Sequence, residues 1–145
     1  MRWTPPALLL AILLVSGPIL AASPPPQLTS ADAAAIHDVI EAQLQAFRSD
    51  DSAQAFAYAS PAIQSIFKNP DTFMSMVRAG YKPVYRPQEV EFRDLVPVEG
   101  RWTQRVLLVG PDGVPIMAQY VMERQLDGSW RIDGCLLERS AEQTT

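Results

Sequence analysis

The sequence predicts one α+β domain, in which three N-terminal helices pack on one face of a curved four-stranded antiparallel sheet. Two observations carry this prediction. Up to residue 80, apolar residues recur at the three- and four-residue spacing of amphipathic helices, whereas beyond residue 89 they nearly alternate with polar residues, as in strands. The length of 145 residues suits one ordinary domain, and no internal repeat is visible.

The first helix is expected to begin at Ser30 and to end near Arg48 or Ser49. Thr29 offers a hydroxyl cap, and Asp32 places a carboxylate in the first turn, where the helix dipole favours negative charge. The apolar stripe that should face the sheet recurs at helical spacing and consists of Ile36, Ile40, Leu44 and Phe47.

A second and a third helix are expected before the sheet. Asp50 and Asp51 are adjacent carboxylates and fit a helix cap better than an acid–base pair, and the stripe behind them is Ala53, Phe56 and Ala57. Ser60-Pro61 should interrupt the second helix, with another turn or two possible over residues 62–67. The third helix has Asn69 as its cap, Pro70 in its first turn and Gly80 at its end.

Four strand-like runs follow, and three short reversals join them into an antiparallel meander. The runs are residues 90–95, Arg101–Val109, Ile116–Gln125 and Ser129–Leu137, and the reversals are Glu99-Gly100, Asp112-Gly113 and Asp127-Gly128. In the second run, Arg105, Leu107 and Val109 share one face, whereas Val106 and Leu108 share the other. Because helices can cover only one face, we expect a homodimer through the opposite face of the sheet.

The N-terminal residues 1–22 are typical of a signal peptide. Arg2 precedes an apolar stretch, Ala7–Val15, that is shorter than the roughly 20 residues of a membrane span, and cleavage is expected near Ala21 or Ala22. We therefore expect an exported protein, periplasmic or secreted, without stable membrane insertion; an uncleaved anchor is the alternative. Residues 23–29 form a proline-rich spacer, 30–139 the domain, and 140–145 a frayed tail.

Charge and composition exclude several kinds of partner. A formal net charge of −4 argues against binding to nucleic acid or to an anionic membrane surface. One cysteine excludes an internal disulfide framework, and one histidine excludes a site with several histidines. His37 and Glu41 lie four residues apart, but a third ligand is missing, so neither a metal nor a cofactor is expected.

The chain resembles the nuclear transport factor 2-like superfamily, on the order of its elements and on the final-strand motif Asp127–Ile132. Within it, the chain is similar to a bacterial family of unassigned function, through Gln43, Ala46-Phe47, Asp50-Asp51, Phe56–Pro61, Tyr81, Pro83–Pro87 and Trp130–Cys135. The superfamily resemblance implies the cone-shaped fold of ketosteroid isomerases and polyketide cyclases, often dimeric. Its enzymes generally place an aspartate or a histidine inside the cone.

The most unusual segment is Tyr81–Pro87, in which two prolines are expected to force an extended path through Lys82 and Arg86. One interpretation is a ligand-binding rim for a small anionic or planar molecule, formed by Tyr85 and Arg86. Further polar groups would come from Gln43 and Tyr58 on helices and Tyr120 on a strand. The other interpretation is a structural strap, with Arg86 paired to Glu89 or Glu91.

Three functions remain open from the sequence. The favoured one is a non-catalytic exported module that binds a ligand or a partner protein. The second is a small cofactor-free isomerase, dehydratase or hydrolase, for which Asp133 is the candidate catalytic carboxylate. The third is a dimeric structural domain. Cys135 has apolar neighbours and is expected to be a buried filler rather than a nucleophile.

Overall fold

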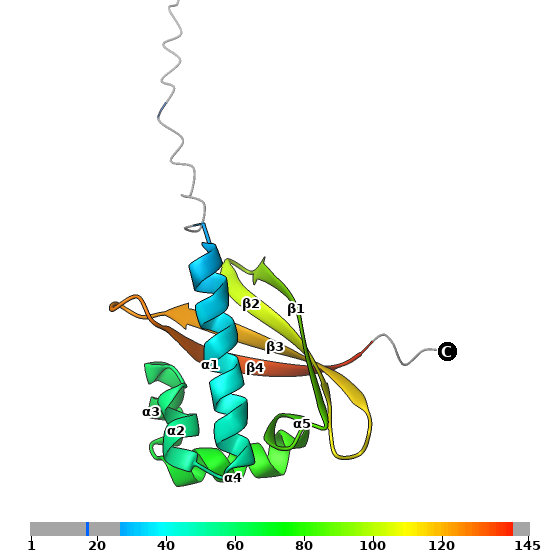
Figure 1. Ribbon diagram of the computed structural model, residues 1–145. Coiled ribbons are helices and arrows are strands. Elements are labelled where there is room, and N and C mark those ends of the chain that lie inside the picture. The colour runs from blue at the N-terminus through cyan, green and yellow to red at the C-terminus, as the bar shows by residue number, and fades with distance from the viewer. Residues whose placement is uncertain (1–16, 18–26, 141–145) are drawn as a thin grey trace, which may run out of the picture.

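The computed structural model describes residue 17 and residues 27–140. Helix α1 (Ser30–Arg48) runs across one face of a four-stranded sheet, and four shorter helices gather near its C-terminal end (Figure 1). Apart from residue 17, the expected signal peptide lies outside the described residues, as do most of the expected spacer and most of the tail. Ser140, the first residue of that tail, is 6% exposed.

Helix α1 begins and ends where the sequence predicts. The Thr29 hydroxyl accepts a hydrogen bond from the Asp32 N–H at 3.0 Å, and the Asp32 carboxylate accepts one from the Thr29 N–H at 3.0 Å, which forms a capping box. The predicted stripe is confirmed, since its members are all at most 1% exposed: Ile36, Ile40, Leu44 and Phe47. This stripe anchors α1 to the sheet.

The second predicted helix is two separate helices, α2 (Ser52–Ala57) and α3 (Pro61–Phe67). Asp51 caps α2 as expected, and Ser60 caps α3. The predicted stripe is wrong for Ala53 and Ala57, which are exposed, whereas Ala55 is fully buried. A six-residue helix is too short for periodicity to set its orientation. The backbone bonds at its ends fix the orientation instead, from Asp51 N–H to the Ala46 carbonyl and through the bridge between Ala59 and Ile132.

Helix α4 (Pro70–Gly80) is the predicted third helix, capped by Asn69, whose side-chain oxygen accepts from the Thr72 N–H at 2.8 Å. The extended path predicted through Lys82 is wrong, because Lys82–Tyr85 forms a one-turn helix, α5. Pro83 occupies the first turn of this helix, where a backbone N–H has no acceptor within the helix, so proline costs no hydrogen bond there. The described residues thus contain five helical segments where the sequence predicts three.

The sheet is the predicted antiparallel meander, with strand order β1-β2-β3-β4. Its strands are β1 (Glu89–Val98), β2 (Arg101–Val109), β3 (Pro115–Arg124) and β4 (Trp130–Arg139). Two irregularities interrupt the register, one between Phe92 and Leu95 on β1 and one opposite the step from Val121 to Met122 on β3. In the second, Val121 pairs with Gly134 and Met122 with Ile132, so Asp133 is an extra residue that forms a β-bulge.

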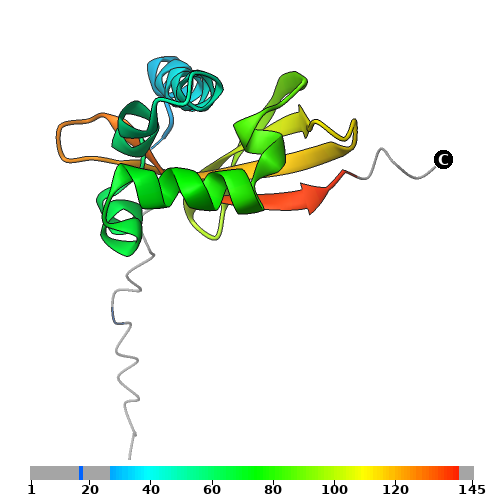
Figure 2. The ribbon, with the colours of Figure 1, turned by 90° about the horizontal axis from the view of Figure 1, so that it is seen from below.

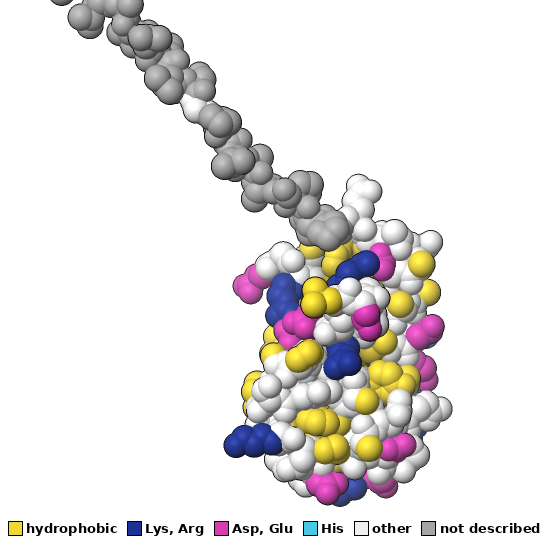
Figure 3. All heavy atoms as spheres, turned by 90° about the vertical axis from the view of Figure 1, so that its left-hand side faces the viewer, with side chains coloured by type: hydrophobic (Ala, Val, Ile, Leu, Met, Phe, Trp, Pro, Cys, Tyr) yellow, Lys and Arg dark blue, Asp and Glu magenta, His cyan; other side chains and the backbone are white. Residues whose placement is uncertain are grey.

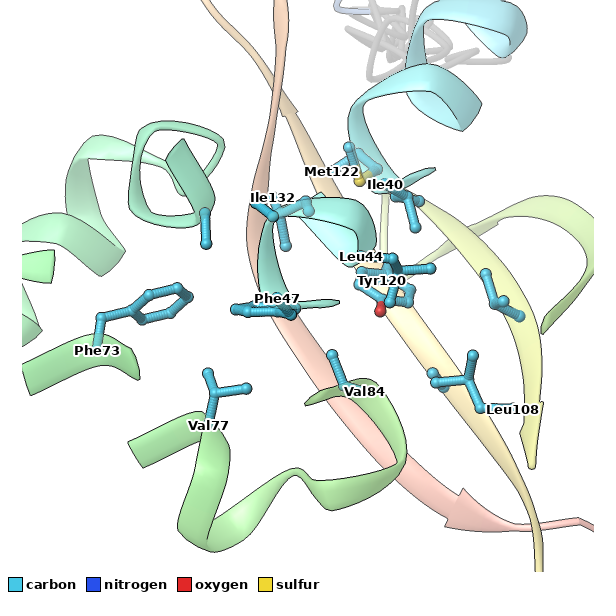
Figure 4. Packing of buried hydrophobic residues seen from close by; sticks show 14 of the residues in the cluster. Ile40, Leu44, Phe47, Phe73, Val77, Val84, Leu108, Tyr120, Met122 and Ile132 are labelled. Atoms are coloured by element: carbon cyan, nitrogen blue, oxygen red, sulfur yellow. The ribbon is translucent and has the colours of Figure 1, made fainter. Parts of the chain in front are cut away.

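The helices cover one face of the sheet, and Figure 2 shows α1 nearly end-on beside the strands. Val106 and Leu108 are fully buried in the main apolar cluster, whereas Leu107 lies outside that cluster, so the predicted alternation along β2 is confirmed. In Figure 4, labelled side chains of α1, α4, α5 and the sheet point toward one another. This core includes Phe47, Phe73, Val84, Tyr120 and Ile132.

Candidate functional site

An apolar cavity of about 330 Å³ lies between the helices and strands β3 and β4. Its volume is at the lower end of the range of small-molecule sites, about 300–1,000 Å³. Most of its wall is apolar, and the apolar residues that line it include Phe47, Ile63, Phe67, Phe73, Val77 and Ile132. Ile66 and Leu136 also line it and are 67% and 60% exposed, so they mark the end that opens to solvent.

The β-bulge at Asp133 builds one wall of this cavity. Ordinary alternation from Ile132 directs Gly134 inward and Cys135 outward. Because the bulge inserts one residue, Ile132 pairs with Met122 and Cys135 pairs with Tyr120, and both β4 side chains pack with the inner cluster. Cys135 therefore faces the cavity, although strict alternation excludes it.

Four polar or weakly polar side chains line the cavity: Gln43, Tyr81, Tyr120 and Cys135. Gln43, 4% exposed, donates from Nε2 to the Ala55 carbonyl at 3.1 Å. The Tyr81 hydroxyl donates to the carbonyl of Cys135 at 3.2 Å. Tyr120 is 1% exposed, and its hydroxyl is the one buried side-chain polar atom without a hydrogen-bond partner among the described residues.

The ionisable groups of the cavity are uncharged at neutral pH. Burial raises the pKa of the Cys135 thiol to about 12 and raises that of Tyr120 well above its ordinary value. Burial also raises the pKa of Tyr81. No described lining residue is Asp, Glu, His, Lys or Arg. The cavity therefore presents hydroxyl, thiol and amide groups within an apolar wall, and no charge.

Of the five binding residues proposed from the sequence, the structure brings Gln43 and Tyr120 together in the cavity and places Tyr58, Tyr85 and Arg86 outside it. Tyr58 accepts a hydrogen bond from the Gln54 amide at 2.8 Å. Neither Tyr58 nor Gln54 lines the cavity. The proposed set is therefore split between two parts of the molecule.

Arg86 is held within the fold. Its guanidinium donates to the Phe47 carbonyl at the C-terminal end of α1 and to Asp50 at 3.0 Å, and it stacks 4.0 Å from the centre of the Tyr85 ring. Its partner is Asp50, not the expected Glu89 or Glu91. Asp50 has a left-handed backbone, with φ of 51°, which aims its carboxylate at this cluster. The Tyr85 hydroxyl, above all, and the charge of Arg86 lower the pKa of Asp50.

Asp133, the candidate catalytic carboxylate, is also outside the cavity. It accepts a hydrogen bond from the Ser60 hydroxyl at 2.5 Å and forms an ion pair with Arg101. Burial alone raises its pKa, but the hydrogen bonds from Ser60 and Arg101 and the charge of Arg101 outweigh burial, so the pKa is lowered. The carboxylate thus ties the start of α3 and the start of β2 to the bulge.

His37, the candidate metal ligand considered from the sequence, makes an aromatic contact. His37 is exposed and stacks on Phe92 with ring centroids 4.0 Å apart. Within residue 17 and residues 27–140, no three His, Cys, Asp or Glu side chains gather as a metal site needs. On the side of the molecule in Figure 3, positive and negative side chains lie among one another rather than in separate patches.

Sequence reasoning missed most of the cavity wall. The sequence predicts only another turn or two over residues 62–67 where α3 lies, yet Ile63, Ile66 and Phe67 all line the cavity. Tyr81 was noted as part of an unusual segment but not as a binding residue. The position of Cys135 depends on the bulge, for which the sequence offers only Gly134 as a signal, since glycine inside a strand often accompanies a bulge.

Comparison with known proteins identifies one family. The family described as Domain of unknown function (DUF4864) matches residues 29–145. No curated protein and no solved structure matches the chain. None of the helices within the described ranges has the length and apolar character needed to cross a membrane.

Proposed function

The chain belongs to this family, and we propose that it is a non-catalytic binding module for a small, uncharged and largely apolar ligand. The observation that carries the proposal is the apolar cavity of about 330 Å³, whose four polar or weakly polar side chains are all neutral at neutral pH. Apolar pockets with a few polar groups are the usual form of small-molecule sites, in which the wall supplies affinity and the polar groups supply orientation.

The chemistry of the cavity favours binding over catalysis. A general acid or base works best when its pKa is close to the working pH. Burial moves the pKa values of Tyr120 and Cys135 away from neutrality, and the Asp133 carboxylate is engaged by Ser60 and Arg101 outside the cavity. A small cofactor-free enzyme remains the alternative, and turnover of a ligand bound in the cavity is the result that favours it.

An uncharged ligand fits better than an anion. Burying an unpaired charge in an apolar site is costly, and no described side chain of the cavity wall carries a positive charge. The arginine expected to receive an anion, Arg86, already binds Asp50 and the Phe47 carbonyl. Of the anionic or planar ligands expected from the sequence, the planar uncharged ones are therefore favoured.

The test uses naphthalene and naphthalene-2-sulfonate as probes, with binding measured by saturation-transfer NMR on the full chain. We expect naphthalene to bind and the sulfonate to bind at least about tenfold more weakly, because it buries an unpaired charge. Val77→Phe, on α4, adds bulk inside the cavity and should weaken naphthalene binding. Leu126→Phe is the matched control, since Leu126 is fully exposed, and it should change nothing.

Folding of the Val77→Phe variant is checked by circular dichroism. Ile63→Phe, at a half-buried lining position on α3, gives a second blocking variant. If naphthalene binds the wild type and both blocked variants equally, the cavity is not the binding site. If neither probe binds the wild type, the module does not bind ligands of this class, and the dimeric structural domain becomes the better proposal.

We also propose that the outward face of the sheet pairs with a second copy of the chain. This face carries apolar side chains from three strands, namely Val96 on β1, Leu107 on β2, which is 9% exposed, and Met117 and Val121 on β3. Four strands of this length cover roughly 30 Å by 19 Å, about 570 Å², which is smaller than the ~800 Å² that each partner buries in an ordinary interface and predicts a weak dimer. Light scattering should give a dimer mass, and Met117→Glu, at a half-buried position of the same face, should reduce it. A monomer mass at every concentration refutes the dimer.

Export and the finer fold assignment complete the proposal. Residues 1–22 support a cleaved signal peptide, and mass analysis of the protein from its native host should give a start near Ala22 or Ser23. Recovery of intact Met1 in the membrane fraction contradicts export.

The helices on one face of an antiparallel meander support membership of the nuclear transport factor 2-like superfamily, with the cavity inside its cone. An experimental structure whose helices cover the other face refutes that membership.

A further inference from the structure

We propose that the cavity selects an apolar ligand that carries one uncharged oxygen acceptor, such as a ketone, aldehyde or ester carbonyl, and that the Tyr120 hydroxyl donates a hydrogen bond to it. The inference rests on the proposed function, because it names the chemistry of a ligand in the same cavity. Its starting point is a feature that apolar packing alone does not explain: a buried hydroxyl without a partner.

Tyr120 differs from the other buried polar side chains of the described residues. Gln43 donates to the Ala55 carbonyl, Gln104 to the Arg93 carbonyl, and Ser60 to Asp133. The Tyr120 hydroxyl has no such partner, although the residue is only 1% exposed (Figure 4). Native proteins pair nearly all buried polar atoms, so an unpaired one needs an explanation such as a missing ligand.

The residues around this hydroxyl do not replace the partner. Its neighbours on the inner face of β3 are Ala118 and Met122, and neither offers a strong acceptor. Directly across the strand pair is Cys135, whose thiol lies close enough to contribute to the raised pKa of Tyr120, but a thiol is only a weak hydrogen-bonding group and does not replace an oxygen acceptor. A phenylalanine would fill nearly the same space without an unpaired oxygen. The hydroxyl therefore costs stability in the empty cavity, and a ligand acceptor removes that cost.

The free polar atom acts as a donor. Burial holds the proton on the Tyr120 oxygen at neutral pH. The two other strong donors of the wall already give hydrogen bonds to backbone carbonyls, Gln43 to that of Ala55 and Tyr81 to that of Cys135. The Tyr120 hydroxyl is the side chain among these three that makes no hydrogen bond, and it calls for an oxygen acceptor on the ligand. A carboxylate is a poorer match than a carbonyl, because the wall holds no cation to pair with it.

The position of Tyr120 also sets the direction of entry. Tyr120 is almost inaccessible, whereas Ile66 and Leu136 are largely exposed and line the same cavity. The oxygen acceptor therefore enters first and reaches the closed end, and the apolar body of the ligand fills the space toward α3 and the edge of β4. Ligands with the acceptor in the middle of a rigid ring system should fit less well.

The experiment compares 1-tetralone with tetralin, its hydrocarbon counterpart, on the wild type and on Tyr120→Phe. Binding is measured by titration NMR on the full chain. We expect Tyr120→Phe to weaken 1-tetralone roughly fivefold to tenfold, the size of one hydrogen bond, and to leave tetralin unchanged or slightly tighter. Tyr81→Phe is the matched control: it removes a hydroxyl from the same wall that is already paired, and it should not alter the preference for the ketone.

A second measurement does not depend on a variant. Infrared spectroscopy of bound 1-tetralone, carbon-13-labelled at its carbonyl, should show the stretch at lower frequency than in an apolar solvent, as a hydrogen bond requires. If both probes bind but Tyr120→Phe affects them equally, or if the stretch is unshifted, the inference is wrong and the proposed function stands. If neither probe binds the wild type, the proposed function fails and the inference fails with it.

Discussion

Replacing Tyr120 with phenylalanine is expected to stabilise the ligand-free protein. The change removes one oxygen atom from a residue that is 1% exposed and leaves the ring in place. Most substitutions in a protein core destabilise it, so a gain in stability is an unusual expectation. It follows from the missing hydrogen-bond partner of this hydroxyl among the described residues.

The magnitude follows from the cost of burying an unpaired polar group, which is about 1–3 kcal/mol. The hydroxyl adjoins a cavity, where its surroundings can relax, so the lower end applies. We expect the free energy of unfolding to rise by about 1 kcal/mol, or the melting temperature by about 4 °C for a domain of this size. Tyr81→Phe should have the opposite sign, because it removes the hydrogen bond to the Cys135 carbonyl and should cost about 1 kcal/mol.

Urea titrations of the wild type and both variants, followed by circular dichroism, measure the two changes. Because the variants remove the same atom from the same residue type, differences in the unfolded state largely cancel. A loss of 1 kcal/mol or more in Tyr120→Phe refutes the reasoning, since it shows that the hydroxyl already has a partner in the ligand-free protein. Equal losses in both variants lead to the same conclusion.

Three further predictions concern stability and reactivity. Arg86→Ala should lower the free energy of unfolding by about 1–2 kcal/mol without any ligand, because the Phe47 carbonyl loses its donor; an unchanged urea midpoint contradicts this. Asp32 has a pKa lowered from 3.8 to about 2, above all by the backbone N–H and hydroxyl of Thr29, and Asp133 is lowered too. Their stabilisation is complete above pH 3.8 and is lost as the pH falls toward 2, so urea midpoints should drop in that window, less steeply in Asp32→Asn. Cys135, with a pKa of about 12, should resist a thiol reagent at pH 8 until denaturant is added, and rapid stoichiometric labelling of the folded protein contradicts this.

The sequence predicts the fold well because its signals are local. Thr29 with Asp32, Asn69 with Pro70, and the glycines of the three hairpin turns each act through neighbouring backbone groups, and each lies at the predicted boundary. The helix at Lys82–Tyr85 is not predicted, because a residue before proline favours extended backbone, whereas proline is also tolerated in the first turn of a helix, where Pro83 lies.

The site was harder to predict because it depends on pairing across long sequence distances. The partner of Arg86 is Asp50, which becomes a neighbour only after α1 and α5 pack together. The extra residue of the bulge, Asp133, moves Cys135 onto the inner face in place of Gly134, so strand periodicity alone points to the wrong residue there. Tyr120 was identified by its residue type and strand, but its lack of a partner is a property of the folded structure only.

The central claim, that the cavity binds a small uncharged apolar molecule, is tested most directly by locating such a molecule on the protein. The measurement is a set of intermolecular nuclear Overhauser effects between naphthalene and the methyl groups of the full chain. We predict contacts to Ile63, Val77 and Ile132, which line the cavity from α3, α4 and β4. Contacts only to Leu107 and Val121, on the outward face of the sheet, or no contacts at all, contradict the claim.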